Sequence, residues 1–259
     1  MSAITLDEHR GSIAVITINR PERRNALDGA AWRAVGDAFH TAAANPDLRT
    51  IILTGSGGHF CAGDDIVAFS RVRDHPGRRA EYWNAIMDCY AAIADARVPV
   101  IAAISGACVG GGCTLALRSD FRIADVTARF GVPPAKLGLV YPAESTRLLV
   151  ATVGLTAAKR MLYTGEIIGA REAHACGLAS LLVEDDVLQA ALDFAQPIIA
   201  NAPIPLAASK LICDAIAADR VDDVSAEFED LFRRADASED CREGARAFAE
   251  KRPARFTGR

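Results

Sequence analysis

Two small-residue segments constrain this chain more than any other feature. They are HFCAGDDI at His59–Ile66 and GACVGGGCT at Gly106–Thr114, and each runs from an apolar, β-branched stretch into a predicted helix start. Backbone N–H groups at a helix start have no partner within the helix, so each segment can point a bare N–H at one ligand oxygen. Taken alone, the run Gly110–Gly112 is also typical of a tight turn with close helix packing.

The rest of the pattern alternates strands with helices, which predicts an α/β core with crossover connections. The expected strands are a hairpin over Ile4–Asn19 with a turn at Arg10–Ser12, then Thr50–Thr54, Val100–Ser105, Phe121–Ala124 and Leu181–Val183. The expected helices are Asp28–Ala44, Arg79–Ala94, Ala143–Val153, Ala157–Tyr163 and Ala170–Cys176.

From about Asp186 the pattern becomes helical throughout. Helical spacing covers Asp186–Asn201, Leu206–Ala218, Asp223–Ala235 and Ser238–Glu250. These segments are too thin to hold a large core alone, so they are expected to pack on the α/β part or on another subunit. We therefore predict a core over residues 1–195 and a C-terminal helical region over residues 196–259.

Composition excludes several classes of function. The chain has 259 residues, 51% hydrophobic content and a net charge of -4, which gives no global attraction to nucleic acid or to an anionic membrane. Seven scattered cysteines without a CxxC pair are typical of reduced, buried thiols. No apolar run approaches the length of a membrane span, and the N-terminus has no signal-peptide pattern, so a cytoplasmic protein is expected.

Several familiar catalytic motifs are missing. Gly106 and Gly111 have the spacing of a phosphate-binding loop, but Gly112 and Cys113 stand where that loop needs lysine and a hydroxyl residue. GxGxxG, GxSxG and HExxH do not occur, and the five histidines lack ligand spacing. The sequence thus predicts neither a metal site nor nucleotide or serine hydrolysis.

Four segments together resemble the crotonase (enoyl-CoA hydratase/isomerase) superfamily. They are RPERRNALD, HFCAGDDI, ISGACVGGGCTLAL followed by SDFRIA, and SEDCREGARAFAEKRPARF, in that order over nearly the whole chain. The resemblance implies a spiral of ββα units, a C-terminal helical region that forms a homotrimer or a dimer of trimers, and an acyl-CoA thioester as substrate. It implies no cofactor beyond the CoA moiety of that substrate.

The resemblance also assigns residues. The thioester oxygen would be bound by the backbone N–H groups of Ala62 and Gly111, which stabilise an enolate. The loop carrying Ala62, Gly63, Asp64, Asp65 and Ile66 would receive the CoA portion. Arg24, Phe248 and Lys251 would contact its phosphates and adenine, although exposed basic side chains are often simply solvated.

One departure from the family pattern bears on mechanism. Hydratases of this superfamily use two glutamates to activate water, and here Thr114 and Pro134 occupy those positions. Neither side chain is a general acid or base near neutral pH. The two-glutamate hydratase mechanism is therefore doubtful for this chain.

Three other residues are candidates for proton transfer. Asp64 follows the Ala62-Gly63 pair and is either an acid/base group or the cap of the helix beginning near Ile66. Tyr141 is either a hydrogen-bond donor to the substrate or a packing tyrosine. Glu144 is a weaker candidate, because an acidic residue is favoured at a helix start in any case.

The sequence therefore predicts an acyl-CoA enzyme acting through a thioester enolate, by hydration or dehydration, isomerisation or decarboxylation. A non-catalytic acyl-CoA-binding protein and a carbon–carbon hydrolase on the same scaffold stay open as alternatives.

Overall fold

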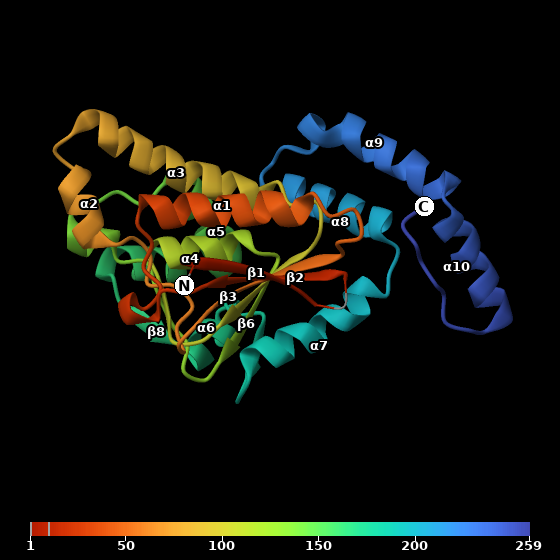
Figure 1. The fold of residues 1–259 in the computed structure, drawn as a ribbon, viewed down its shortest axis with the longest axis horizontal. Coiled ribbons are helices and arrows are strands. Elements are labelled where there is room, and N and C mark those ends of the chain that lie inside the picture. The colour runs from red at the N-terminus through yellow and green to blue at the C-terminus, as the bar shows by residue number, and fades with distance from the viewer. Residues whose placement is uncertain (1, 10) are drawn as a thin grey trace.

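The computed structural model describes residues 2–9 and 11–259, and its centre is a six-stranded sheet (Figure 1). The strand order is β1 (Ile4–His9), β2 (Ile13–Ile18), β3 (Thr50–Gly55), β4 (Val100–Ile104), β6 (Phe121–Asp125) and β9 (Leu181–Val183). The β1–β2 pair is antiparallel and every later pair is parallel. Parallel pairing requires crossover helices, which matches the alternating pattern of the sequence.

A second, three-stranded sheet makes the fold a spiral. Its order is β5 (Ala107–Val109), β7 (Arg129–Gly131) and β8 (Ile167–Gly169). The chain passes from β4 to β5 and then into α4 (Gly111–Arg118), and from β6 to β7 and then towards α5 (Ala143–Thr164). Each of these two turns thus gives one strand to each sheet and leads into one helix. This is the predicted spiral of ββα units.

The two faces of the large sheet bury different side chains. Ala14, Ile16 and Ile18 of β2 belong to the cluster beneath α1 (Gly29–Ala43) and α3 (Pro76–Ala94), whereas Ile13 and Val15 belong to the cluster beneath α7 (Val187–Ile199). This alternation is what a strand buried on both faces must show. Figure 1 shows α1 and α3 on one side of the sheet and α7 on the other.

Several predicted elements were found with small shifts. Asp28 caps α1 by accepting a hydrogen bond from the Ala31 N–H, 2.9 Å away. The two helices predicted over residues 143–163 form one element, α5, broken at Gly154, where φ is +77°. The pattern missed the three-residue strands β5, β7 and β8, whereas the equally short β9 was predicted. The first residue of the predicted turn at Arg10–Ser12, Arg10, lies outside the described residues.

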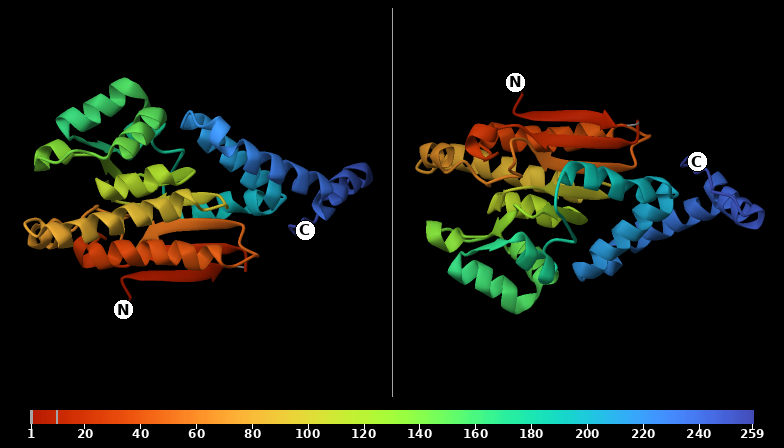
Figure 2. Two further views of the ribbon diagram at one scale, coloured as in Figure 1. Left: turned by 90° about the horizontal axis from the view of Figure 1, so that it is seen from above. Right: turned by 90° about the horizontal axis from the view of Figure 1, so that it is seen from below.

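The C-terminal helices leave the core. They are α8 (Pro203–Ala217), α9 (Val221–Ala237) and α10 (Glu239–Glu250), and the blue end of the chain projects from the body in both views of Figure 2. Only Ala215 is buried in α8, and no residue is buried in α9. The predicted boundary after residue 195 falls inside α7, whose Ala195 and Ile198 pack on the sheet. The core therefore continues to the end of α7.

Among the described residues, no single helix is long and apolar enough to cross a membrane. Only α7 and α8 taken together reach that length and composition, and they are bent by 109° relative to each other.

Candidate active site

The two small-residue segments lie against each other at the ends of β3 and β4. The N–H of Cys61 donates to the Ala107 carbonyl at 2.8 Å, and the N–H of Val109 donates to the Cys61 carbonyl at 3.0 Å. Gly63 (φ +89°) fits so closely that a Cβ there would lie 2.6 Å from the Val109 oxygen and 2.9 Å from the Gly111 nitrogen. A glycine is therefore required at position 63 both by its backbone conformation and by the lack of space.

The two predicted N–H donors are in different states. Gly111 is the first residue of α4, so its N–H makes no hydrogen bond within the helix. No other acceptor for this N–H occurs among the described residues. The N–H of Ala62 donates to the Arg24 carbonyl at 3.0 Å. Gly111 is therefore a free donor, whereas Ala62 would have to share or exchange its present bond.

Asp64 is held beside Gly111 by two aromatic side chains. Its Oδ1 accepts hydrogen bonds from the Trp32 indole N–H at 3.1 Å and from the Tyr82 hydroxyl at 3.3 Å. Its Oδ2 would lie 3.3 Å from a Cβ placed on Gly111. Asp64 does not cap α2 (Ile66–Val72), because the carboxylate that accepts the Ala68 N–H is that of Asp65.

Burial raises the pKa of the Asp64 carboxyl above its ordinary value. The hydrogen bonds from Trp32 and Tyr82 favour the ionised form and offset part of this rise. A carboxyl group with a raised pKa, next to a free backbone donor, is suited to take up and return a proton.

Thr114 and Pro134, which the resemblance places where hydratases carry glutamates, hold no titratable carboxyl. The Thr114 hydroxyl is fully buried and lies 2.6 Å from the Tyr141 hydroxyl. Pro134 begins the short helix η2 (Pro134–Leu137). Burial raises the pKa of Tyr141 well above its ordinary value, so its hydroxyl stays protonated and serves as a hydrogen-bonding group.

Glu144 is committed to a surface ion pair. Its two carboxylate oxygens accept from Arg147 at 3.0 and 2.7 Å, one turn along α5. This pairing lowers the pKa of Glu144. A half-exposed carboxylate held by an arginine is a poor proton donor, so the structure does not favour Glu144 as the acid.

Asp65 has a structural task that the sequence did not suggest. Besides capping α2, its carboxylate pairs with the Arg23 guanidinium at 3.0 Å, and its side chain is almost completely buried. The pair ties residues 20–28 to the loop that carries Ala62 and Asp64. Ile66, which follows it, is 45% exposed and available for contact.

The predicted CoA contacts lie at different ends of the chain. Arg24 is exposed beside the 62–65 loop and has a left-handed backbone conformation, with φ +51°. Phe248 and Lys251 belong to the end of α10, far from α2 in Figures 1 and 2. A single chain therefore does not bring them to the site, because the C-terminal helices extend away from the core.

Two residues of this site were missed by sequence reasoning: Trp32 and Tyr82. They lie on the buried faces of α1 and α3, where aromatic residues are typical of a hydrophobic core. Only the packing of both helices against the 62–65 loop shows that their polar atoms meet Asp64. The sequence contains no local signal for this.

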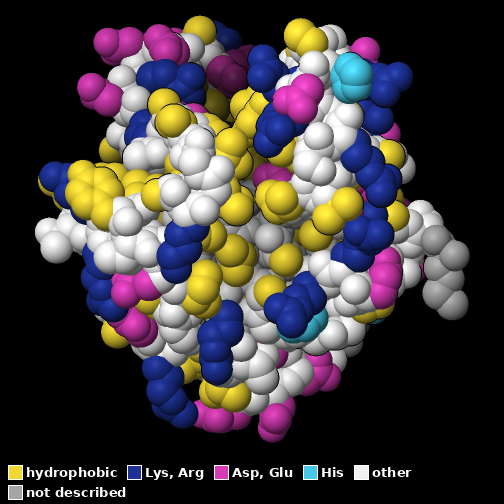
Figure 3. All heavy atoms as spheres, turned by 90° about the vertical axis from the view of Figure 1, so that its left-hand side faces the viewer, with side chains coloured by type: hydrophobic (Ala, Val, Ile, Leu, Met, Phe, Trp, Pro, Cys, Tyr) yellow, Lys and Arg dark blue, Asp and Glu magenta, His cyan; other side chains and the backbone are white. Residues whose placement is uncertain are grey.

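The face at the α2 end of the molecule is hollowed and rich in hydrophobic side chains, with lysines and arginines around them (Figure 3). Exposed apolar residues come from α2, from the end of η2 and from the segment after it: Ile66, Val67, Leu137, Leu139 and Val140. Apolar surface of this kind is typical of ligand-binding sites.

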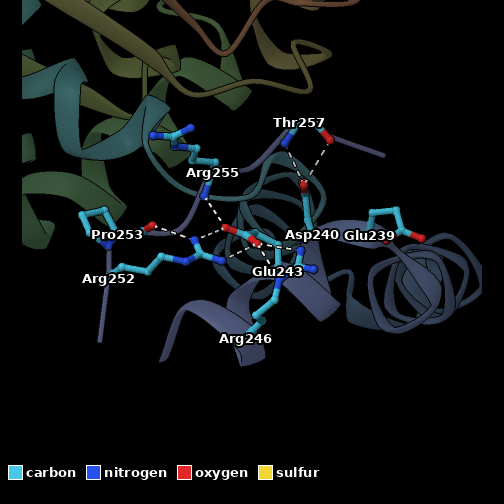
Figure 4. Close-up of a pocket in the computed structure, with 8 residues that line it drawn as sticks. All are labelled: Glu239, Asp240, Glu243, Arg246, Arg252, Pro253, Arg255 and Thr257. Carbon is cyan, nitrogen blue, oxygen red and sulfur yellow. Dashed lines mark hydrogen bonds and ion pairs between the residues drawn. The ribbon is translucent and has the colours of Figure 1, made fainter. Parts of the chain in front are cut away.

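A second hollow of about 620 Å³ lies between α10 and the C-terminal tail (Figure 4). Here the Asp240 carboxylate accepts the N–H groups of Thr257 at 2.7 Å and Gly258 at 2.8 Å, and Glu243 accepts from Arg252 at 2.6 Å. The carboxylates facing this hollow are thus engaged within the chain. No group of three potential metal ligands occurs there or elsewhere in residues 2–9 and 11–259.

Comparison with known proteins gives one consistent result. The family model "Enoyl-CoA hydratase/isomerase" matches residues 8–259. A crotonyl-CoA hydratase of Syntrophomonas wolfei is 34% identical over 251 residues, covering 96% of each chain, and an enoyl-CoA hydratase of Mycobacterium tuberculosis is 34% identical over 261 residues, covering 98% of this chain and 96% of its own. The solved structure of an enoyl-CoA hydratase/carnithine racemase from Magnetospirillum magneticum superposes with a TM-score of 0.92 at 34% identity, covering 100% of this chain and 97% of that one.

Proposed function

This chain belongs to the enoyl-CoA hydratase/isomerase family, and from that premise we propose that it binds an acyl-CoA thioester and stabilises its enolate at Gly111. The free N–H of Gly111 receives the thioester oxygen, and Ala62 supplies a second donor when it exchanges its bond with the Arg24 carbonyl. Removing one such donor typically costs about 2.7 to 4 kcal/mol of transition-state stabilisation. Arg24 and the 62–65 loop contact the CoA portion, and no further cofactor is required.

The observation that carries the proposed reaction is the position of Asp64. It is a buried carboxyl group with a raised pKa beside Gly111, whereas Thr114 and Pro134 leave the usual acid positions without a proton carrier. One carboxyl group is enough to remove a proton from one carbon of the enolate system and return it to another. We therefore favour double-bond isomerisation next to the thioester, with Asp64 as base and then as acid.

Hydration is the second candidate, because the relatives reported above are named hydratases. It requires a group that activates water in addition to one that protonates the enolate. The Thr114–Tyr141 pair does not supply that base, since the tyrosine hydroxyl stays protonated. Decarboxylation needs only protonation of the enolate and is the third reaction to be assayed.

A panel of three substrates separates these reactions. A 3-enoyl-CoA gains conjugated enoyl-thioester absorbance on isomerisation, crotonyl-CoA loses it on hydration, and methylmalonyl-CoA releases carbon dioxide. We expect turnover of the 3-enoyl-CoA, and a fall in kcat of about 10²- to 10⁴-fold in Asp64→Asn. Asp186→Asn is the matched control, because it makes the same aspartate-to-asparagine change at the N-cap of α7.

Full activity of Asp64→Asn on whichever substrate turns over would remove Asp64 from the mechanism. Binding of acyl-CoA without turnover on the whole panel would identify a binding protein. If CoA thioesters failed to raise the melting temperature, the carbon–carbon hydrolase would be favoured, since a ligand that binds only the native state must stabilise it.

We also propose that the C-terminal helices form a homotrimer or a dimer of trimers. They expose large apolar side chains, including Ile216, Val221, Phe232 and Phe248. Such surface is typical of subunit contacts. In an oligomer Phe248 and Lys251 can reach the CoA of a neighbouring subunit, which a single chain does not allow. Light scattering coupled to size-exclusion chromatography measures the assembly directly.

A further inference from the structure

Arg118, the last residue of α4, is a partly buried cation without a carboxylate partner. Its Nε is buried and has no hydrogen-bond partner, and none of the ion pairs among the described residues includes it. The guanidinium carbon lies 4.8 Å from the centre of the Tyr90 ring. An aromatic face attracts a cation but does not replace a counter-ion, so a charged group in this setting is costly unless an anion joins it.

The nearest carboxylate within the chain is already engaged. Glu144 acts on Arg118 electrostatically, but both of its oxygens are bonded to Arg147. The other groups that act on Arg118 electrostatically are Tyr90, Tyr141 and Cys89. Burial raises the pKa of all three side chains, so they stay protonated and uncharged. Among the described residues, the one carboxylate that acts on Arg118 is therefore already paired with Arg147.

Arg118 shares a helix face with the candidate site. Gly111, Thr114 and Arg118 are spaced i, i+3 and i+7 along α4, so their side chains follow one stripe of the helix. The stripe is about 10 Å long, at a rise of 1.5 Å per residue. Helical side chains lean towards the helix N-terminus, which brings the guanidinium back towards Thr114 and Gly111.

Aromatic contacts connect Arg118 with the other side of the site. Tyr90, beneath the guanidinium, packs edge-on against Trp32 with ring centres 5.6 Å apart, and Trp32 donates to Asp64. Thr114 lies between the hydroxyl groups of Tyr90 and Tyr141. An acyl chain that starts at Gly111 and follows α4 would pass these neutral groups and end at a cation.

We propose that Arg118 binds a negatively charged group at the far end of the acyl chain, so that the substrates are CoA thioesters of short dicarboxylic acids. This inference rests on the proposed binding of the thioester at Gly111. The anion is distal, because Arg118 lies two helical turns from Gly111. A carboxylate on the carbon next to the thioester, as decarboxylation requires, would not reach it.

The test compares two ligands that differ only in this charge. Dissociation constants are measured by calorimetry for glutaryl-CoA and pentanoyl-CoA, which have five-carbon acyl groups, and for the six-carbon pair adipoyl-CoA and hexanoyl-CoA. We expect the wild-type protein to bind at least one dicarboxylic thioester about 10- to 100-fold more tightly than its partner, which is the contribution of a charge-assisted hydrogen bond. This comparison requires no variant.

Arg118→Met then removes the charge and keeps a long side chain. It should abolish the preference and leave the binding of pentanoyl-CoA unchanged or tighter. Arg97→Met is the matched control, because it removes an arginine that is 82% exposed at the surface, and it should keep the preference.

The possible failures are distinguishable. The wild-type protein could bind each monocarboxylic thioester at least as tightly as its dicarboxylic partner, pentanoyl-CoA against glutaryl-CoA and hexanoyl-CoA against adipoyl-CoA. That result would overturn the inference about Arg118 and leave the proposed thioester site intact. A preference that persists in Arg118→Met assigns recognition to another residue and also overturns the inference. If none of the thioesters binds, the proposed function and this inference both fail.

Discussion

Asn25 offers the sharpest test of how the candidate site is held in place. Its side chain is completely buried and makes three hydrogen bonds to the backbone of two other segments. Oδ1 accepts the Arg20 N–H at 2.8 Å, and Nδ2 donates to the carbonyls of Ser56 at 2.9 Å and His59 at 2.6 Å. The residue thereby fixes the turn whose Arg24 carbonyl meets Ala62.

Replacing Asn25 by alanine leaves three buried backbone groups without partners. Each lost bond costs about 1 to 2 kcal/mol once the orphaned partner is counted, so the three bonds together contribute roughly 3 to 6 kcal/mol. Asn25 also has φ +59°, a conformation that costs an alanine about 1 kcal/mol more than an asparagine. The free energy of unfolding of Asn25→Ala should therefore fall by about 4 to 7 kcal/mol.

Urea unfolding at fixed protein concentration measures this loss through the transition midpoint. Asn25→Gly loses the same three bonds without the strain of a Cβ, so comparing the two variants isolates the backbone contribution. Asn201→Ala is the control, because Asn201 is exposed and makes a single bond, to the Pro197 carbonyl. A loss below about 1 kcal/mol for Asn25→Ala, the range of ordinary surface substitutions, would refute this account.

Three further predictions follow from the same contacts. Gly63→Ala should weaken acyl-CoA binding at least tenfold, in line with the displacement of one donor. Gly58→Ala is the control, because Gly58 also has a positive φ (+77°) but has open space around it, and its acyl-CoA affinity should be unchanged. Calorimetry measures both dissociation constants. Burial raises the pKa of Asp64, so the native state binds more protons at this group than the unfolded state does. The free energy of unfolding of the wild-type protein, relative to that of Asp64→Asn, should therefore fall as the pH rises from 4 towards 7. Urea titrations at each pH measure this difference. Asp240→Asn should loosen the C-terminal tail and speed amide exchange at Thr257, measured by hydrogen exchange, with little change in activity.

The sequence predicted the fold well because its signals are local or repeated. Alternating apolar strands and capped helices determine the large sheet and its crossovers, as the Asp28 cap of α1 shows. The small sheet was missed, since two of its three short strands contain glycine and all three are recognised only by their pairing, whereas the equally short β9 has no glycine. The end of the core was placed too early, because the amphipathic pattern of α7 does not reveal whether it packs on a sheet or on a helix.

The candidate site was only partly predictable for the same reason. The glycines around Gly111 are visible in sequence because a bare N–H requires a special backbone. The role of Asp64, in contrast, depends on Trp32 and Tyr82, which lie 32 and 18 residues away along the chain. The sequence offered Asp64 as a possible cap of α2, and only the structure shows that Asp65 is the cap.

The changes at the site are more readily understood together than one by one. If the family's hydratases carry two glutamates at the positions of Thr114 and Pro134, as the resemblance implies, those carboxylates would repel an anionic acyl group, and here neither position carries a charge. The remaining carboxyl, Asp64, lies on the other loop, and burial raises its pKa. Arg118 places a positive charge along the same helix face as Thr114. Such an arrangement of charges would match a substrate that brings its own negative charge, so the proposed isomerisation and the proposed dicarboxylic substrates would both follow from it.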